Sequence, residues 1–336
     1  MKIAAGVFIF LLISVQICNA QEYHGAYMEF YFFHKPSTST EGTGKIYLNS
    51  NKDAFSSLYN PALPSYSDNL KISYSNSQKA FLHVNAFYNA FGVDVPVKKI
   101  GTFSLVRNFT SIEDDFVDFP IKRRYLSYSL NYSRDVFKGF FLGIGANYFK
   151  WEYQPPSNYP SNYYFPQPDF SEYYSFNLGV SYNYTLPESE YYSQNAFINF
   201  SILNIPTSHS PLPQIDRVSL GYISKYKGFG IIKGMDDFQT DIQIEEVDLL
   251  NSYYYNTFSL GAEIKFLEII SLRAGNYFFA VDYMTFGLGL SLPLKLLTKI
   301  PLVIGFDYSH LKAPVFYYQG YKIFDSFAMN VSYDIN

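Results

Sequence analysis

The sequence predicts an all-β fold, a transmembrane antiparallel β-barrel of about 14 strands with an N-terminal plug or hatch segment. Three observations support this prediction. Apolar residues alternate with polar residues or glycine in segments of about ten residues, as in 258–264, 286–292 and 327–335. An apolar run near the N-terminus is typical of an exported protein. In addition, 20% of the residues are aromatic.

The first residues have the form of a cleaved signal peptide. Lys2 precedes an apolar run from Ile3 to Val15, and compact residues at 18–20 follow it. This run is too short to span a bilayer, and its flanks are those of a signal peptide. We therefore expect residues 1–20 to be removed on export. A lipoprotein is the less favoured alternative, because no small residue stands directly before Cys18.

Composition excludes several classes of function. Cys18 is the only cysteine, so a mature chain without it forms neither disulfides nor thiolate metal sites. The net charge of −4 argues against a nucleic-acid partner, which a concentrated basic surface would favour. The 34 tyrosines and 33 phenylalanines fit aromatic girdles at two membrane interfaces. Outer-membrane lipid is thus the first expected partner.

The alternation gives each expected strand an apolar face and a polar face. Even-numbered positions from 176 to 184 are apolar or aromatic, whereas odd-numbered positions from 175 to 183 are small or polar. A soluble β-sandwich would show the same pattern. The aromatic content and the export signal favour the membrane barrel.

Continuing this pattern along the chain places about fourteen strands, an even number as in bacterial barrels. Their ranges are 68–76, 79–91, 96–107, 122–135, 138–151, 173–185, 195–203, 216–224, 237–246, 256–266, 269–277, 283–292, 301–309 and 324–336. Most links after odd-numbered strands are long and most others are short, which predicts a periplasmic N-terminus. The exceptions are a short link around Ser77 and a longer turn at 186–194. Residues 68–336 would form the barrel and residues 21–67 the plug.

A short motif lies just before the first expected strand. Its residues are Asp53, Ala54, Tyr59, Asn60, Pro61 and Ala62. This motif resembles one in the FadL-like outer-membrane β-barrels, particularly in their PorV/PorQ-type branch. The order of the segments 261–263 (GAE), 272–275 (LRAG) and 286–289 (FGLG) resembles the C-terminal half of that branch. Two departures are Leu63, where glycine is usual, and the non-aromatic C-terminal Asn336.

The resemblance implies a barrel of the bacterial outer membrane that is plugged by its own N-terminal segment. In FadL such a barrel passes long-chain hydrophobic molecules, and transport of a hydrophobic small molecule is the leading expectation here. The alternative, implied by PorV, is a membrane-anchored accessory protein of the type IX secretion system that binds secreted or surface proteins. Fold alone does not decide between them.

Charged residues on the expected inner faces form a first candidate site. They are Lys71, Glu263, Lys265, Arg273 and Asp307, and Arg107 is placed at a strand end. They could hold the plug or guide a polar group of a ligand. The favoured interpretation is simpler: neighbouring strands pair opposite charges in a wet lumen.

The Asn60-Pro61 pair is a second candidate site, because it fixes a turn whose polar groups could bond to groups of the lumen wall. Such a turn could act as a structural hinge or as a gate.

A third candidate site is an aromatic outer loop suited to binding a protein or glycan, or to extending the upper aromatic girdle. Its residues are Trp151, Tyr153, Tyr159, Tyr163, Tyr164 and Phe165.

The sequence gives little support for catalysis, a cofactor or a metal. Its five histidines are scattered, and no serine elbow motif occurs. A barrel phospholipase would need a serine beside His83 or His310 on the lipid-facing wall. The acidic triplet at 113–115 and the acidic pair at 236–237 could bind calcium. Solvated turns are the favoured interpretation, because neither lies in a loop with regularly spaced oxygen ligands.

Overall fold

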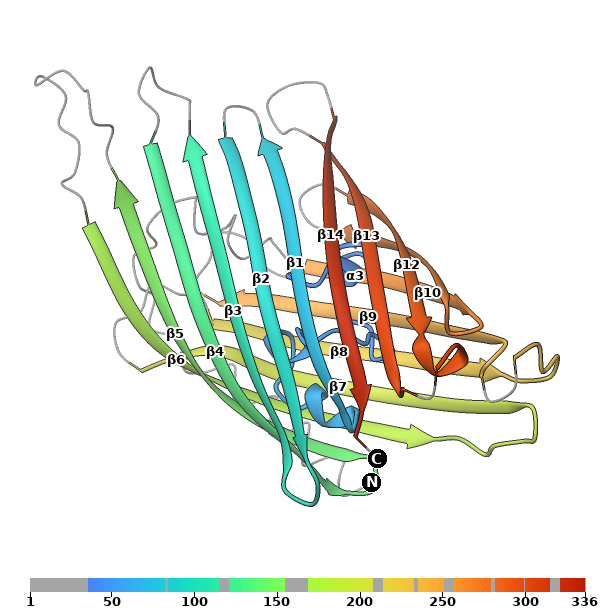
Figure 1. The fold of residues 1–336 in the computed structure, drawn as a ribbon. Helices are drawn as coiled ribbons and strands as arrows, with labels where there is room; N and C mark the ends of the chain where they lie inside the picture. The colour runs from blue at the N-terminus through green and yellow to red at the C-terminus, as the bar shows by residue number, and fades with distance from the viewer. Residues whose placement is uncertain are drawn as a thin grey trace, which may run out of the picture.

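The computed structural model describes residues 36–81, 84–114, 121–154, 169–207, 214–232, 235–250, 257–278, 282–298, 300–314 and 321–335. In this part of the chain, fourteen antiparallel strands form a closed barrel (Figure 1). Each strand pairs with its neighbours in sequence, and β1 closes the barrel against β14. The predicted fold class is confirmed. No helix within the described ranges is long and apolar enough to cross a membrane.

The strands are β1 (Asn69–Phe81), β2 (Val84–Val97), β3 (Gly101–Asp114), β4 (Ile121–Phe137), β5 (Phe140–Gln154), β6 (Asp169–Thr185), β7 (Tyr192–Pro206), β8 (Gln214–Tyr226), β9 (Phe238–Leu250), β10 (Thr257–Phe266), β11 (Ile270–Phe278), β12 (Asp282–Pro293), β13 (Leu302–Pro314) and β14 (Tyr321–Asp334). The short helices are α3 (Thr38–Glu41), η1 (Ser56–Leu58), η2 (Leu63–Tyr66) and η3 (Leu294–Leu296).

The predicted strands correspond in order to the observed strands, but many observed strands are longer, and the predicted ranges 79–91 and 96–107 each begin within the preceding observed strand. Ser77 lies within β1 rather than in a link, because its pairing with β2 continues to Phe81. Trp151 and Tyr153 lie in β5 rather than in the following loop, because pairing with β4 continues through both residues. Polar and aromatic residues beyond the alternating stretch still complete the ladder, since hydrogen bonding there needs only backbone.

The two faces of the wall differ as the alternation predicts. Along β10 the odd-numbered residues are buried in the lumen, whereas Leu260 and Ile264 on the outer face are each 43% exposed. Inward positions are mostly serine, asparagine, glycine or charged residues, and outward positions are mostly leucine, isoleucine, phenylalanine or tyrosine. The outer face therefore offers a continuous apolar belt to lipid.

The two ends of the barrel are distinguished by their links. We call the end where β1 begins and β14 ends the turn end; the links 98–100, 138–139 and 267–269 lie there. The opposite end, the loop end, carries the longer link 155–168. The alternation of long and short links has exceptions, because the link 227–237 at the turn end is long and the link between β1 and β2 at the loop end is short. In barrels of this kind short turns face the periplasm and long loops face outward.

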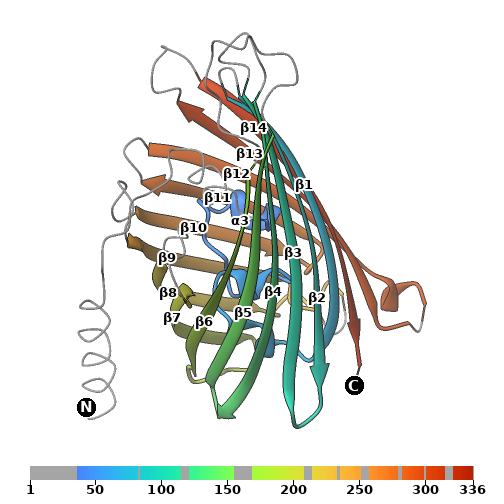
Figure 2. The ribbon, with the colours of Figure 1, turned by 90° about the vertical axis from the view of Figure 1, so that its left-hand side faces the viewer.

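Residues 36–68, here called the inner segment, lie inside the barrel. Figures 1 and 2 show this segment, in blue, enclosed by the strands in two perpendicular views. Its helix α3 contacts β12, β13 and β14, whereas η2 contacts β3, β4 and β5 on the opposite wall. The segment therefore crosses the lumen. The predicted signal peptide 1–20 and residues 21–35 of the predicted plug lie outside the described residues.

The lipid-facing belt predicts how stability depends on depth. Leu288→Arg, in the middle of β12, should reduce the free energy of unfolding by about 2–4 kcal/mol, because it places a charge near the bilayer midplane. Leu292→Arg, on the same face at the turn end, should cost about 0–1 kcal/mol. Urea unfolding in lipid vesicles measures both. Equal losses at the two positions would contradict a lipid-facing β12.

Candidate functional site

Glycines on the inner face bring the inner segment into direct contact with the wall. Gly143 of β5 and Gly179 of β6 are cross-strand partners. A Cβ atom at Gly143 would lie 2.1 Å from the carbonyl carbon of Pro61, and one at Gly179 would lie 2.1 Å from Oδ1 of Asn60. Neither position therefore has room for a side chain. Glycine within a strand often marks such a close approach of another backbone.

We call such a pair of glycines in contact with the inner segment a glycine seat. Gly143 and Gly179 form the first seat, and a second seat lies across the lumen, on β10 and β11. Gly261 and Gly275 are also cross-strand partners. A Cβ atom at Gly261 would lie 2.4 Å from the carbonyl oxygen of Thr43, and one at Gly275 would lie 2.2 Å from the amide nitrogen of Gly44. That amide donates to Oγ1 of Thr285 at 2.7 Å. The two glycine pairs thus hold the inner segment at two separated points.

The Asn60 side chain anchors the first seat. Its Nδ2 donates to the carbonyl oxygens of Val180 on β6 and Phe200 on β7, at 3.0 and 3.1 Å. Its Oδ1 accepts from the amide of Ala62 at 2.9 Å. Both amide hydrogens and the acceptor are thus used, as a buried asparagine requires. Next to it, the hydroxyl of Ser201 donates to the carbonyl oxygen of Tyr59 at 2.8 Å.

Four of the five predicted lumen charges form one cluster. Glu263 pairs with Lys265 at 2.8 Å and with Arg273 at 2.7 Å, and Arg273 also pairs with Asp307. All four side chains are largely buried. Lys71 lies apart from this cluster, opposite Asp94 of β2. Arg107 lies within β3 and not at a strand end, on the outer face beside Phe91.

The charge cluster also binds the inner segment, through Ser50. The hydroxyl of Ser50 donates to Glu263 at 2.8 Å, and Nζ of Lys265 donates to the carbonyl oxygen of Ser50 at 2.7 Å. The amide of Ser50 donates to Oδ2 of Asp241 at 3.0 Å. The two interpretations of these charges are therefore compatible: the wall charges pair with one another and also hold the segment. Ser50 carries no sequence signal, because serine is common throughout the chain.

Asp53 organises the inner segment itself. Its carboxylate accepts from the hydroxyls of Ser37 and Ser39 and from the amide of Phe55 at 3.0 Å. Within the described ranges no cation forms an ion pair with it, and burial raises the pKa of this carboxyl above its usual range. The adjacent Ala54 amide donates to Oγ of Ser73 on β1 at 2.8 Å. Asp53 thus binds the region of Ser37 and Ser39, and Ala54 bonds the same stretch to the wall at β1.

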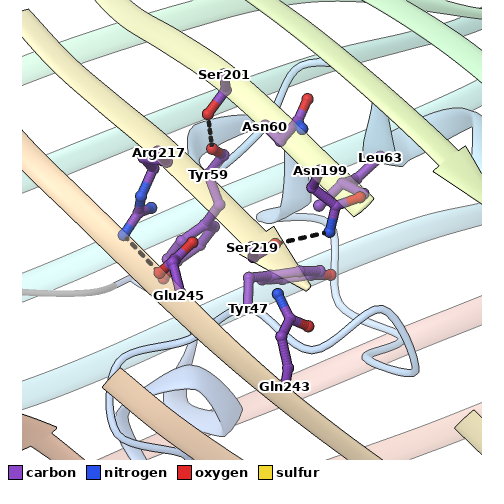
Figure 3. Close-up of a pocket in the computed structure, with 10 residues that line it drawn as sticks. All are labelled: Tyr47, Tyr59, Asn60, Leu63, Asn199, Ser201, Arg217, Ser219, Gln243 and Glu245. Atoms are coloured by element: carbon purple, nitrogen blue, oxygen red, sulfur yellow. Dashed lines mark hydrogen bonds and ion pairs between the residues drawn. The ribbon is translucent and has the colours of Figure 1, made fainter. Parts of the chain in front are cut away.

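A polar pocket lies between the inner segment and strands β7–β9 (Figure 3). The figure shows its lining: Tyr47, Tyr59, Asn60, Leu63, Asn199, Ser201, Arg217, Ser219, Gln243 and Glu245. The buried side chains of Arg217 and Glu245 pair at 3.3 Å, and the guanidinium of Arg217 lies 5.3 Å from the centre of the Tyr59 ring. The lumen is therefore polar and charge-paired beside β7–β9, whereas Tyr47, Tyr59 and Leu63 also belong to an apolar cluster that includes Ala90 of β2 and Val106 of β3.

An apolar cluster lies in the lumen toward the loop end of β2–β6. Its buried members are Ala86, Tyr88, Ile112, Tyr125 and Phe149, and Trp151 and Tyr173 pack against them. The rings of Tyr125 and Phe149 are 6.1 Å apart. Trp151 thus packs in the lumen rather than forming an outer loop, and Tyr153 on the same face of β5 is buried as well. Tyr159, Tyr163, Tyr164 and Phe165 lie outside the described residues.

The described residues provide no catalytic constellation around His310. Its Nδ1 lies 3.2 Å from Oδ1 of Asp325, which also accepts from the hydroxyl of Tyr308 at 2.6 Å. The nearby Ser309 and Ser326 are buried on the lumen side of the wall and so lie on the opposite face. His83 lies outside the described residues. Within the described ranges, no three histidine, cysteine or acidic side chains are grouped as metal ligands.

The acidic segments considered for calcium serve other roles. The Asp237 carboxylate accepts backbone N–H groups of Phe229, Gly230 and Ile231 in the β8–β9 turn, at 2.7, 2.9 and 3.1 Å. Asp236 pairs with Lys225 and Lys227. In the other segment, Glu113 lies in β3 and pairs with Lys122, and Asp115 lies outside the described residues.

Comparison with known proteins identifies similar structures but no sequence relative. No family model matches the chain, and no curated protein matches it. The toluene transporter TodX of Pseudomonas putida is 12% identical over 94% of this chain and 98% of its own, with a TM-score of 0.52. The monoaromatic hydrocarbon channel CymD is 11% identical over 88% of this chain and 96% of its own, with a TM-score of 0.51. At these identities the likeness establishes the barrel fold alone.

The glycine seats predict a test of how firmly the inner segment is held. Gly179→Ala should displace Asn60 and lower the free energy of unfolding by about 1–3 kcal/mol, because the new methyl group overpacks the seat. Gly305→Ala is the matched control, since the nearest atom to its added Cβ lies 3.5 Å away. Hydrogen exchange at residues 59–62 and urea unfolding measure both effects. Unchanged exchange in Gly179→Ala would contradict the seat.

The burial of Asp53 predicts that the stability of the protein depends on pH. Because the folded-state pKa of Asp53 is raised, the stability that its protonated form contributes is fully present below the ordinary carboxyl pKa of about 4. It is lost as pH rises through the raised value. Asp53→Asn cannot ionise at this position. Its urea midpoint should therefore change less with pH than that of the native chain, between the ordinary carboxyl pKa and the raised pKa of Asp53. Identical pH profiles for both proteins would exclude Asp53 as the titrating group.

Proposed function

We propose that this chain is an outer-membrane channel for hydrophobic small molecules, with the inner segment as the element that closes it. The observation that carries the proposal is the apolar cluster in the lumen, since most inward positions elsewhere are polar. Apolar and aromatic side chains with a few polar groups are the usual lining of sites for hydrophobic ligands. Its position toward the loop end suits a molecule that arrives from outside the cell.

The similar structures support this substrate class. TodX is described as a toluene transporter and CymD as a monoaromatic hydrocarbon channel, and each aligns over most of this chain. The ring-rich cluster around Tyr88, Tyr125 and Phe149 offers faces and edges on which an apolar or aromatic molecule can pack. Below it the inner segment crosses the lumen. Passage through the barrel therefore requires either movement of that segment or a route around it.

A second candidate function rests on the polar middle of the lumen. The Glu263 cluster and the Arg217–Glu245 pair fill this region with charge pairs, and the inner segment is bonded to the wall on several sides. A firmly closed lumen suits a membrane-anchored interaction protein, such as a PorV-like accessory of type IX secretion. Membership of the PorV/PorQ-type branch belongs to this second proposal.

One experiment separates the two functions. A deletion strain is complemented with the native chain, with Phe149→Asn or with Phe149→Leu, and uptake of a hydrophobic small molecule such as toluene is measured beside the profile of secreted proteins. A channel predicts reduced uptake in the deletion strain and in Phe149→Asn, with uptake retained in Phe149→Leu because leucine keeps the cluster apolar. A changed secretome with normal uptake would reject the channel and support the accessory protein.

A further inference from the structure

The link between β8 and β9 presents exposed apolar side chains at the turn end of the barrel. Its described residues are 227–232 and 235–237. Phe229 is 66% exposed and Ile231 is 62% exposed, whereas Leu260 on the lipid-facing belt is 43% exposed. Exposed apolar side chains that adjoin one another mark a surface for a partner or a membrane.

Phe229 lies on the outer face of the wall. Its ring packs edge-on against the rings of Tyr226 and Phe238, with centroids 5.4 and 6.0 Å apart. Tyr226 and Phe238 are cross-strand partners of β8 and β9. They share the parity of the exposed outward residues Leu220 and Ile242 on the same two strands. The link therefore folds back over the lipid-facing side of β8 and β9.

Polar contacts, and not burial of the two apolar side chains, fix the shape of this link. The Asp237 carboxylate accepts the three backbone N–H groups of residues 229–231. The amide of Lys227 donates to the carbonyl oxygen of Tyr191 at 3.0 Å. The apolar side chains are thus presented on an ordered backbone, which lowers the entropic cost of binding to them.

The apolar surface of the link continues into the belt of the barrel. Phe238 packs edge-on against Phe266 of β10, with ring centroids 5.3 Å apart. Every outward residue of β10 is apolar: Phe258, Leu260, Ala262, Ile264 and Phe266. With a rise of about 3.4 Å per residue and a tilt of about 40°, this run crosses roughly 20 Å of an apolar band about 25 Å tall. Phe266 therefore lies within that band or at its edge, two ring contacts away from Phe229.

Two lysines flank this apolar surface. Asp236 pairs with Lys225 at 3.4 Å and with Lys227 at 3.3 Å, and the side chain of Lys227 is 58% exposed. Lysine stems lie along apolar surface at membrane ends while their ammonium groups stay in the aqueous layer. Exposed apolar residues next to cations are typical of segments that lie in a membrane interface.

We propose that the β8–β9 link is a membrane anchor, with Phe229 and Ile231 inserted among the acyl chains of the periplasmic leaflet. Lipid is the occupant because the surface is continuous with the lipid-facing side of β10. A protein bound there would have to displace the lipid that covers that strand. The anchor fixes the depth of the turn end in the bilayer. It lies on the outer face and does not depend on the proposed channel function.

Tryptophan fluorescence of the full chain in lipid nanodiscs tests this position. The chain has a single tryptophan, so Trp151→Phe supplies a background without tryptophan emission. Phe229→Trp and Ile231→Trp are introduced separately into that background as reporters. Leu260→Trp is the control for a lipid-facing position, and Glu188→Trp is the control for an exposed polar link at the turn end.

The nanodiscs contain phosphatidylcholine with ordinary or brominated acyl chains, and iodide serves as the quencher in water. Heat-modifiable migration confirms that each variant is folded. Both reporters should lose about as large a fraction of their fluorescence in brominated lipid as Leu260→Trp does. Glu188→Trp should lose little in brominated lipid and be quenched by iodide instead.

Strong quenching of both reporters by iodide, with no effect of brominated lipid, would overturn the proposal and place the link in the periplasm. Protection from both quenchers would also overturn it, because the surface would then be covered by protein. Dimers trapped by cross-linking in that case would identify the covering protein as a second copy of the chain.

Discussion

The structure depends on the requirement that every backbone N–H and C=O group in a bilayer be paired. An open sheet cannot meet it, so β1 pairs with β14 and the sheet has no edge. Closure fixes an inside and an outside for each strand, and the period of two then sends alternate side chains to lipid or to the lumen. The same closure creates an interior that must be filled or hydrated, and the inner segment fills part of it.

The inner segment is held by backbone contact as much as by side chains. The wall has no side chain at Gly143, Gly179, Gly261 and Gly275, so the segment approaches closely enough for Asn60 to bond to carbonyl groups of β6 and β7. Between these seats, Ser50 completes the charge cluster around Glu263. A buried carboxylate with two cationic neighbours is stabilised by such an added donor. Wall and segment are therefore one hydrogen-bonded unit, and movement of the segment would break contacts at several strands together.

The lumen changes character along its axis. Toward the loop end it is apolar and aromatic. At the level of the inner segment, charge pairs and polar groups lie beside a second apolar cluster of Tyr47, Phe55, Tyr59, Leu63, Ala90 and Val106. A hydrophobic molecule would gain contact in the first region, whereas the charge pairs of the second region disfavour it. This contrast is why the apolar cluster supports a channel, whereas the bonded inner segment supports an anchored interaction protein.

The sequence by itself determined the barrel, its approximate strand positions and the face of nearly every strand, because a side-chain period of two is a local property. It also placed Lys71, Glu263 and Arg273 on inward positions. Only the tertiary structure decided that Ser50 joins the Glu263 cluster, that paired glycines seat residues 43–44 and 60–62, and that Trp151 packs inside the barrel. Those contacts join residues that are far apart in sequence. They arise only once closure brings opposite walls around the inner segment, so no local pattern encodes them.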